Sequence, residues 1–589
     1  MYRVGQNFSG GILLGFAVVS LLCGCDSNRG DSASIKIRWA HDPETLDPLL
    51  LANQTAIDVN NLLNLSLLQA DLSTQKIAPA LAETLPAVQL EGDSLMRLRY
   101  GIRPAAAWDD GRPVLASDVA FTLKLMFCPG VPNEMARRQY RFIQAVLADP
   151  QDPRRFSFVC KGQALDYMKA SGDFFILSEA ALDPRGQLRR FTLAELQKRP
   201  ATAPPDSALQ AVAGRYAAAD PGQWPAHLPG CGPYQLVKWE KDRYLTLRRK
   251  PHWWADKVRP TPFVLQARPP QLEYVVIPDA AAATLALRRG DLDIYPQMPT
   301  SAFARLRASA ASQATLQFYS TTSYDVVTVG FNTRRPRLAD ALTRQALTRC
   351  FDAKGLLNAT ERGGGQAAVG FVSPNDRINY NDSLAPLPFD PSSAAALLGR
   401  AGWRRGTAEA GWFRPGPQGE KQQLRLTMRY RAEEALFGTI ALQFQAAAAG
   451  IDVPVALQPT ESGAFSEALA KGDFDVYVRV LRGNPFMFNF MPLLHSEAAG
   501  TGNTSGYTNP EADRLLEAIA GAENLAQRAV LLRRFQTLMQ REVPMVPLFF
   551  LANRIAASRR LTGLHVSSLK PGYTVTAIEQ ASDASPTRP

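Results

Sequence analysis

The sequence of 589 residues has few of the residues that usually carry catalysis or bind metals, with only five histidines and six cysteines. No HExxH, CxxC or GxSxG motif is present. Metal sites need closely spaced ligands, and a serine hydrolase needs its nucleophile on a tight turn, so we predict no metal, no cofactor and no enzymatic activity. A hydrolase is the weaker alternative. The histidines are scattered along the chain, at His41, His227, His252, His495 and His565.

The apolar run near the N-terminus is too short to span a membrane. It covers the twelve residues from Gly11 to Leu22, whereas a spanning helix needs roughly 20. Arg3 precedes the run and Leu22-Cys23-Gly24-Cys25 follows it, the order of a signal sequence. This ending resembles the lipobox of bacterial lipoproteins. The resemblance implies that residues 1–24 are a signal peptide and that Cys25 is acylated; an uncleaved signal or plain anchor is the alternative.

The residues after the predicted lipid site complete this interpretation. Residues 25–34 are small and polar and would form a tether. By the same resemblance, Asp26 implies retention on the periplasmic side of the inner membrane. The mature chain would keep Cys128, Cys160, Cys231 and Cys350, and an oxidising compartment permits pairs. Proximity in sequence favours Cys128 with Cys160, although four cysteines allow three full pairings.

Basic residues do not run together in this chain. The sequence has 65 Lys and Arg against 54 Asp and Glu, a formal net charge of +11. A nucleic-acid-binding chain would cluster this charge or carry a recognition motif, so we predict a solvated basic surface and no nucleic-acid partner. The composition, 46% hydrophobic and 20% charged, is typical of a globular chain with two or three domains.

Residues 96–127 give the clearest local pattern. Apolar and polar residues alternate from Met96 to Ile102, which predicts a strand. Asp109-Asp110-Gly111 has turn chemistry, although the two acids could instead serve as general acid and base. Ser117 is the expected N-cap of a helix whose first turn contains Asp118. Trp108, Asp110-Gly111, Pro113 and Ala116 to Val119 resemble a signature of the family 5 extracellular solute-binding proteins, which are the oligopeptide, dipeptide and nickel receptors of ABC importers.

Other landmarks of this family lie before and after this stretch, in the order in which the family has them, about ten in total between residues 35 and 570. They include Leu46-Asp47-Pro48, Pro79 to Glu83, Gly232-Pro233-Tyr234, Arg344 to Leu347, Phe389-Asp390-Pro391 and Pro544 to Phe550. The resemblance implies an α/β fold of the periplasmic-binding-protein type, with two lobes, an extra subdomain in lobe one and a ligand cleft between the lobes.

The resemblance also sets the expected domain boundaries. Lobe I covers 35–322, with an inserted subdomain at about 72–228, and lobe II covers 323–547. The chain returns to lobe I at 548–575, and 576–589 form a polar tail. Within lobe II, the alternating strand and helix patterns of residues 424–480 predict a βαβαβ unit. Two chain crossings between the lobes suit a hinge.

By resemblance, the chain is a monomeric receptor that binds a peptide or peptide-like solute and delivers it to an ABC permease. Signalling or chaperoning, or a non-peptide solute that is anionic or a metal chelate, remain alternatives. Peptide receptors of this family capture the ligand ammonium with an aspartate shortly after the strand that here runs from Phe474 to Val480.

The corresponding segment of this chain, Arg479 to Pro485, has no acid. Arg479 or Arg482 could therefore face an anionic group, or either could be a surface arginine. By position in the family, Gln54, Ser323, Tyr324 and Asn484 are candidate cleft residues, and core or surface roles remain open for each.

Overall fold

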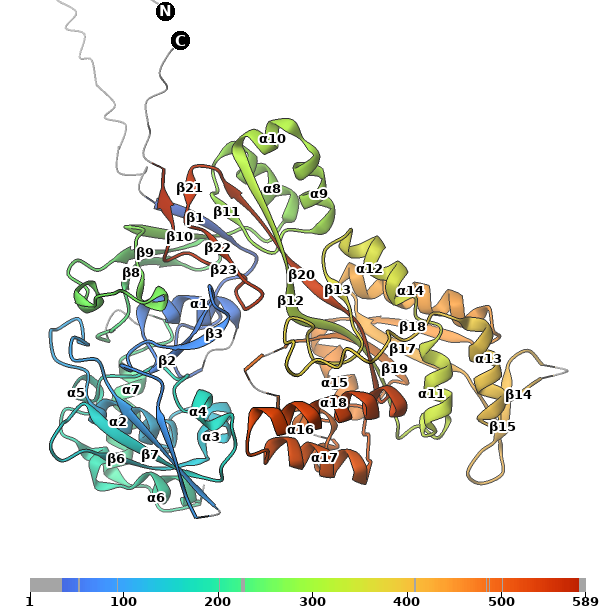
Figure 1. The fold of residues 1–589 in the computed structure, drawn as a ribbon, viewed down its shortest axis with the longest axis horizontal. Coiled ribbons are helices and arrows are strands. Elements are labelled where there is room, and N and C mark those ends of the chain that lie inside the picture. The colour runs from blue at the N-terminus through green and yellow to red at the C-terminus, as the bar shows by residue number, and fades with distance from the viewer. Residues whose placement is uncertain are drawn as a thin grey trace, which may run out of the picture.

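The computed structural model (Figure 1) describes residues 34–50, 53–92, 94–200, 202–223, 228–406, 409–483, 485–486, 488–500 and 502–581. The predicted signal peptide, Cys25 and Asn484 lie outside these residues. The fold class is confirmed, because two α/β lobes stand side by side and the long strands β12 (Leu316–Phe331) and β20 (Met545–Ser558) run through both. None of the helices within the described ranges combines the length and apolar character of a membrane span.

One sheet joins the two lobes. Its order is β18-β17-β19-β12-β20-β11-β1-β10-β9-β8, with β13 (Gln366–Ala367) pairing with β20. The lobe I strands are β1 (Ser34–Trp39), β8 (Tyr234–Glu240), β9 (Tyr244–Arg249), β10 (Gln271–Val276) and β11 (Ile294–Tyr295). Strand β1 is parallel to both β10 and β11, and α8 (Ala280–Arg289) connects β10 with β11, which gives a strand-helix-strand unit.

The remaining lobe I elements surround this half of the sheet. They are α1 (Gln54–Leu63), β2 (Leu68–Asp71), β3 (Lys76–Pro79), the 3-10 helix η5 (Phe263–Leu265), α9 (Thr300–Ala308), α10 (Ala310–Thr315), and β21 to β24 (Leu561–Thr562, His565–Val566, Tyr573–Thr574, Glu579–Gln580). The predicted start of the polar tail at residue 576 is therefore too early, because β24 extends the fold to Gln580. Ala577 and Ile578 are buried, Ile578 belongs to the lobe I core, and β24 pairs with β21.

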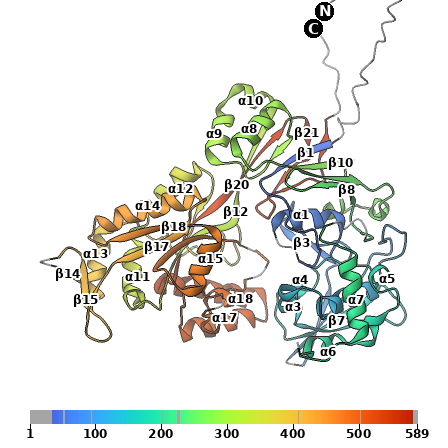
Figure 2. The same cartoon turned by 180° about the vertical axis from the view of Figure 1, so that it is seen from behind.

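A second sheet forms a separate layer below lobe I. Its order is β4-β5-β7-β6, and it contains β4 (Ala87–Glu91), β5 (Leu95–Gly101), β6 (Ile143–Ala148) and β7 (Arg155–Lys161). Its helices are α2 (Ala116–Met126), α3 (Glu134–Tyr140), α4 (Tyr167–Ala170), α5 (Glu179–Leu182), α6 (Leu193–Lys198) and α7 (Ser207–Ala218). Both ribbon views show this layer facing lobe II (Figures 1 and 2).

The predicted cap of α2 is wrong. The N-cap residue is Leu115, and Ser117 lies inside the first turn. The buried Asp118 carboxylate accepts hydrogen bonds from the backbone N–H groups of Leu115 and Glu179, both at 2.9 Å. Leu115 has no side-chain oxygen, and the carboxylate of Asp118, at the third helical position, instead satisfies the backbone N–H of this N-cap residue.

Lobe II contains the predicted βαβαβ unit. Strand β17 (Leu426–Arg431) lies between β18 (Val455–Thr460) and β19 (Val476–Leu481) and is parallel to both. The connecting helices are α14 (Ala435–Ala449) and α15 (Ser462–Lys471). Around them lie α11 (Ala341–Thr348), α12 (Ala353–Glu361), α13 (Pro391–Arg400), β14 (Arg404–Arg405), β15 (Trp412–Pro415), β16 (Lys421–Gln423), α16 (Met491–Leu494), α17 (Pro510–Ala520) and α18 (Leu525–Glu542).

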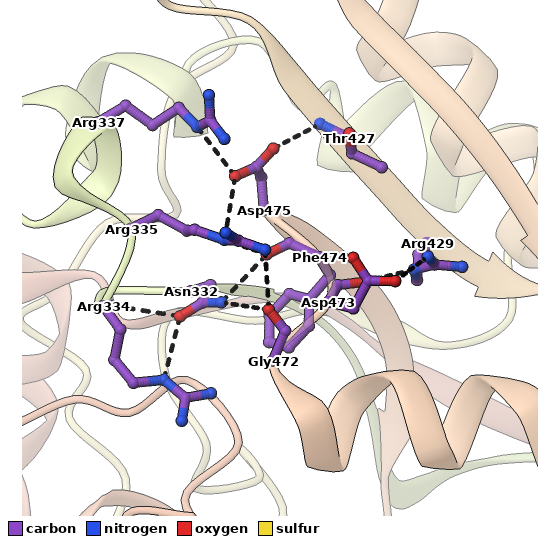
Figure 3. A network of polar contacts seen from close by, with 10 residues as sticks. All are labelled: Asn332, Arg334, Arg335, Arg337, Thr427, Arg429, Gly472, Asp473, Phe474 and Asp475. Atoms are coloured by element: carbon purple, nitrogen blue, oxygen red, sulfur yellow. Dashed lines mark hydrogen bonds and ion pairs between the residues drawn. The ribbon is translucent and has the colours of Figure 1, made fainter. Parts of the chain in front are cut away.

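The end of β12 is held against this unit by a polar cluster (Figure 3). Asp475 is buried and accepts hydrogen bonds from the Arg337 Nε, at 3.0 Å, and the Thr427 backbone N–H, at 2.8 Å. Asn332 donates to the carbonyl oxygens of Gly472 and Phe474. These buried polar groups are mutually satisfied, which gives the cluster a structural role.

Strands β12 and β20 change register where the chain passes between lobes. Thr322 pairs with Ala552 and Val326 with Phe550, so the three intervening residues of β12 are opposed by one residue of β20. Ser323 donates from its hydroxyl to the Leu551 carbonyl oxygen at 2.8 Å. An interrupted ladder bends more easily than a regular one, so this point suits a hinge. The other domain boundaries stay a prediction.

The four cysteines of the described chain are free thiols, so the preferred Cys128–Cys160 pair is wrong. All four are buried, and desolvation by burial raises the pKa of Cys160 to about 12 and that of Cys128 to about 11. Each packs as a small apolar residue within a core. Sequence proximity was misleading because Cys160 lies on β7, whereas Cys128 lies in the turn that follows α2.

Candidate functional site

A first cavity of about 430 Å³ opens on the side of lobe I that faces lobe II. Helix α1 contributes Gln54 and Asp58, β10 contributes Tyr274, and β23 contributes Tyr573. Phe263 and several aliphatic side chains make much of the remaining wall apolar. An apolar cavity with a few polar groups is typical of a small-molecule site.

A second cavity of about 300 Å³ lies on the lobe II side. Within the described ranges, its wall carries one cationic group, on Arg482, and one carboxylate, on Asp376. The uncharged polar side chains are those of Tyr324, Ser373 and Asn489, and three phenylalanines, Phe371, Phe488 and Phe490, supply aromatic surface. Arg482 is exposed there. An accessible guanidinium beside aromatic rings can bind a carboxylate in a bidentate manner.

The two cavities adjoin at the loop after β19. Phe486 lines the first cavity and its neighbour Pro485 lines the second. The ammonium of Lys169, on α4 of lobe I, lies 5.6 Å from the centre of the Phe486 ring. A solute that fills both cavities would touch both lobes.

The lobes also contact each other directly. The Arg528 guanidinium on α18 and the Asp166 carboxylate, at the start of α4, are 2.5 Å apart. The Arg528 side chain is only 4% exposed and its guanidinium lies over the Phe488 ring, 5.3 Å from its centre. This ion pair joins residues 362 positions apart and exists only while the lobes are close.

Two carboxyl groups line the first cavity. Desolvation by surrounding protein atoms raises the pKa of Asp58 to about 7, against the opposing effect of a 2.9 Å hydrogen bond from Gln54. Asp173 is open to the cavity, yet desolvation raises its pKa also to about 7, opposed by a 2.7 Å hydrogen bond from the Tyr140 hydroxyl. Each carboxyl group thus exchanges its proton near neutral pH.

The structure brings three of the predicted site residues to these cavities. Gln54 lines the first, whereas Tyr324 and Arg482 line the second. The Tyr324 hydroxyl also reaches across to the Gln75 side chain of lobe I, at 3.5 Å. Asn484 lies outside the described residues.

Two other predicted residues, Ser323 and Arg479, are not among the residues that line either cavity. Ser323 is buried and uses its hydroxyl in the hinge. Arg479 is half-buried on β19, with its guanidinium 5.3 Å from the centre of the Tyr477 ring. Position within the family could not distinguish these side chains from true cavity residues.

Sequence reasoning missed Asp58, Asp173, Tyr274 and Tyr573. The spacing of Gln54 and Asp58, one helical turn apart on α1, was the only available signal. The tyrosines are far apart in sequence and meet only through the sheet and the returning C-terminal segment. Across the described ranges, no three His, Cys, Asp or Glu side chains gather closely enough to hold a metal ion.

Comparison with known families gives one extended match. The sequence model described as "Bacterial extracellular solute-binding proteins, family 5 Middle" matches residues 76–501, which is most of the chain. Heme-binding protein A of Haemophilus influenzae is 24% identical over 336 residues, 57% of this chain and 56% of that protein. Oligopeptide-binding protein AppA of Bacillus subtilis is 21% identical over 544 residues, 91% of this chain and 89% of that protein.

Solved structures support the same fold. The structure of AppA from Bacillus subtilis in complex with a nonapeptide has a TM-score of 0.69 at 19% identity. The superposition covers 93% of this chain and 99% of that one. At this identity the likeness establishes the two-lobe architecture and leaves the ligand to be argued from the cavities.

Proposed function

Since the chain belongs to the family 5 bacterial extracellular solute-binding proteins, we propose that it captures a peptide or peptide-like solute between its lobes and delivers it to an ABC permease. Members of this family are extracytoplasmic binding proteins without catalytic activity. The observation that carries the proposal is the pair of adjoining cavities, one on each lobe, which meet at Phe486.

The mechanism follows from this geometry. A solute that contacts both lobes binds the closed arrangement more tightly than the open one, and so shifts the population toward closure. Bending at the interrupted ladder near Ser323 would allow the movement, and the Asp166–Arg528 ion pair would form as the lobes meet. A permease that reads the closed shape would then accept only loaded protein.

The cavity walls support a peptide-like solute. The first cavity combines apolar surface for side chains with carboxyl and phenol groups, and the second offers the Arg482 guanidinium. Several relatives and solved structures, AppA among them, bear names or descriptions that refer to oligopeptides or dipeptides. Arg482 also favours a second candidate, an anionic solute that is not a peptide.

We also propose that Cys25 carries a lipid that holds the protein at the periplasmic side of the inner membrane. The described chain begins at Ser34 on β1, a lobe I strand between β10 and β11 that lies near the top of the molecule in Figure 1. Attachment there leaves lobe II free to move. Mass spectrometry of the N-terminal peptide from a membrane fraction tests the acylation; an unmodified Cys25 would contradict it.

Native mass spectrometry of the purified mature protein tests the main proposal. We expect retained or added peptides at one copy per chain, together with a smaller radius of gyration in X-ray scattering when they are bound. Recovery of an anionic non-peptide solute would support the second candidate. Conversion of a bound compound by the isolated protein would refute a pure binding role.

A further inference from the structure

The first cavity has a polar floor made by three side chains from distant parts of the chain. Tyr274 and Tyr573 are only 2% and 3% exposed, and both line the cavity beside Asp58. Their hydroxyls make no hydrogen bond to any residue within the described ranges, although the Tyr274 ring is fixed by stacking on Trp39 at 4.0 Å. Since neither hydroxyl oxygen is fully enclosed by protein atoms, both are accessible from the cavity and can accept a hydrogen bond from a group that enters it.

Asp58 also lacks a cationic partner among the described residues. Its carboxylate accepts one hydrogen bond, from Gln54. The two ammonium groups that line the same cavity have other neighbours: Lys570 lies 2.8 Å from Asp325, and Lys169 faces the Phe486 ring and lies near Asp166 and Asp376. The other charged group of the wall, Asp173, has the same sign as Asp58.

An uncompensated carboxylate in an apolar cavity is costly unless a cation neutralises it. The surrounding groups suit an ammonium in particular. Phenol oxygens accept its remaining N–H bonds, and aromatic faces attract its charge. The chain is also without the acid that peptide receptors of this family place after the strand equivalent to β19.

On the basis of the proposed function, we propose that the first cavity binds a primary ammonium group of the solute. Asp58 accepts its charge-assisted hydrogen bond, and the Tyr274 and Tyr573 hydroxyl oxygens accept two more. The ammonium anchor would therefore lie on lobe I, while Arg482 on lobe II remains available for the opposite charge.

Binding of an ammonium group at this site is coupled to release of a proton from Asp58. Because the pKa of Asp58 is about 7 in the free protein, a bound ammonium would keep the carboxylate ionised and release the proton below that pH. Affinity for amines should therefore fall as the pH drops below about 7. The groups nearest to Asp58 are the tyrosines Tyr274 and Tyr573 and the amide of Gln54, none of which changes charge near neutrality. Lys169, Lys570 and Asp173 also line the cavity, and Asp173, whose pKa is about 7, would lose its negative charge over the same pH range and add to the fall in affinity.

The test uses a mixture of synthetic dipeptides to nonapeptides with free N-termini, and the same mixture after N-acetylation, which removes the ammonium charge. Native mass spectrometry should show that wild-type protein captures the free peptides at least about tenfold more than the acetylated ones. In Asp58→Asn this preference should disappear. In Tyr573→Phe, which keeps the ring and removes only the hydroxyl, it should fall a fewfold.

The matched control is Asp473→Asn, because that carboxylate pairs with Arg429 at 2.5 Å in the polar cluster at the end of β12 (Figure 3). It should keep the wild-type preference. Equal capture of both mixtures by the wild type, or an unchanged preference in folded Asp58→Asn, would overturn the ammonium site and leave the proposed function standing. Capture of neither mixture would overturn the proposed function, and the ammonium site with it.

Discussion

At the scale of single residues, the first cavity concentrates groups that work against stability. Asp58 and Asp173 each resist ionisation near neutral pH, because surrounding protein atoms desolvate their carboxylates. A sequence selected only for stability would fill such a space with apolar side chains. Sites that bind ligands commonly retain this cost.

Asp58→Asn should therefore stabilise the ligand-free protein at pH values above about 7, by about 1–3 kcal/mol. The folded-state pKa of about 7 lies above the unfolded value of about 3.9, so the folded chain binds the extra proton between them. The contribution of Asp58 to the free energy of unfolding is fully present below about pH 4 and is lost as the pH rises through about 7. Urea denaturation at several pH values should show that the free energy of unfolding falls less in the variant than in the wild type as the pH rises from about 4 to about 7. The same pH dependence in both proteins would contradict this.

Arg482→Ala should weaken binding of peptides with a free C-terminal carboxylate by about tenfold, and should leave the corresponding peptide amides unaffected. The reason is that Arg482 is exposed in the second cavity. Calorimetry with both peptide forms measures the difference. Arg429→Ala, which removes a guanidinium held by Asp473, is the control. Unchanged affinity in Arg482→Ala would refute its assignment.

At the scale of helices and strands, local signals predicted much of the fold. Asn509 followed by Pro510 marks the start of α17, and Gly290, at a positive φ of 83°, ends α8. These features depend on residues a few positions apart. The sequence from Arg337 to Ala353 suggests a single helix, but α11 covers only Ala341–Thr348 of it, because Asp340 caps its start. A new helix, α12, begins at Ala353 after its own cap, Asp352.

The candidate site was less predictable because its residues meet through tertiary packing. Asp58, Tyr274 and Tyr573 come from α1, β10 and β23, and no spacing in the sequence links them. Family position placed Gln54, Tyr324 and Arg482 at the cavities but also suggested Ser323 and Arg479, which line neither. Whether a strand residue faces a cleft or a core depends on the neighbouring strands.

One element-scale prediction concerns the pairing of β12 with β19. Gly330 lies opposite Tyr477, and a Cβ at Gly330 would come within 2.2 Å of the buried Tyr477 ring. Gly330→Ala should destabilise the protein by about 1–3 kcal/mol, because the ring must move within a packed core. Thermal unfolding measures the loss. Gly399→Ala, where a Cβ meets nothing within 4 Å, is the control and should be neutral or slightly stabilising.

At the scale of the whole molecule, the Asp166–Arg528 ion pair links the two lobes. Asp166→Asn should favour the open arrangement, since it leaves the buried Arg528 without a full counter-charge in the closed one. We expect peptide affinity to fall about tenfold and the radius of gyration of the ligand-free protein to increase. Asp152→Asn, which removes an exposed pair with Arg155 inside lobe I, should change neither. Equal changes of peptide affinity and radius of gyration in Asp166→Asn and Asp152→Asn would contradict a specific role of the Asp166–Arg528 ion pair in holding the lobes together.

The two ends of the described chain meet on lobe I, where the Gln580 side chain donates a hydrogen bond to the Ser34 carbonyl oxygen at 3.4 Å. A fluorescent pair placed at both termini would therefore report no opening, however wide. A useful sensor needs one fluorophore at a terminus and the other on α13 or α14. The same adjacency makes the chain suitable for circular permutation, with new ends placed in an exposed loop of lobe II.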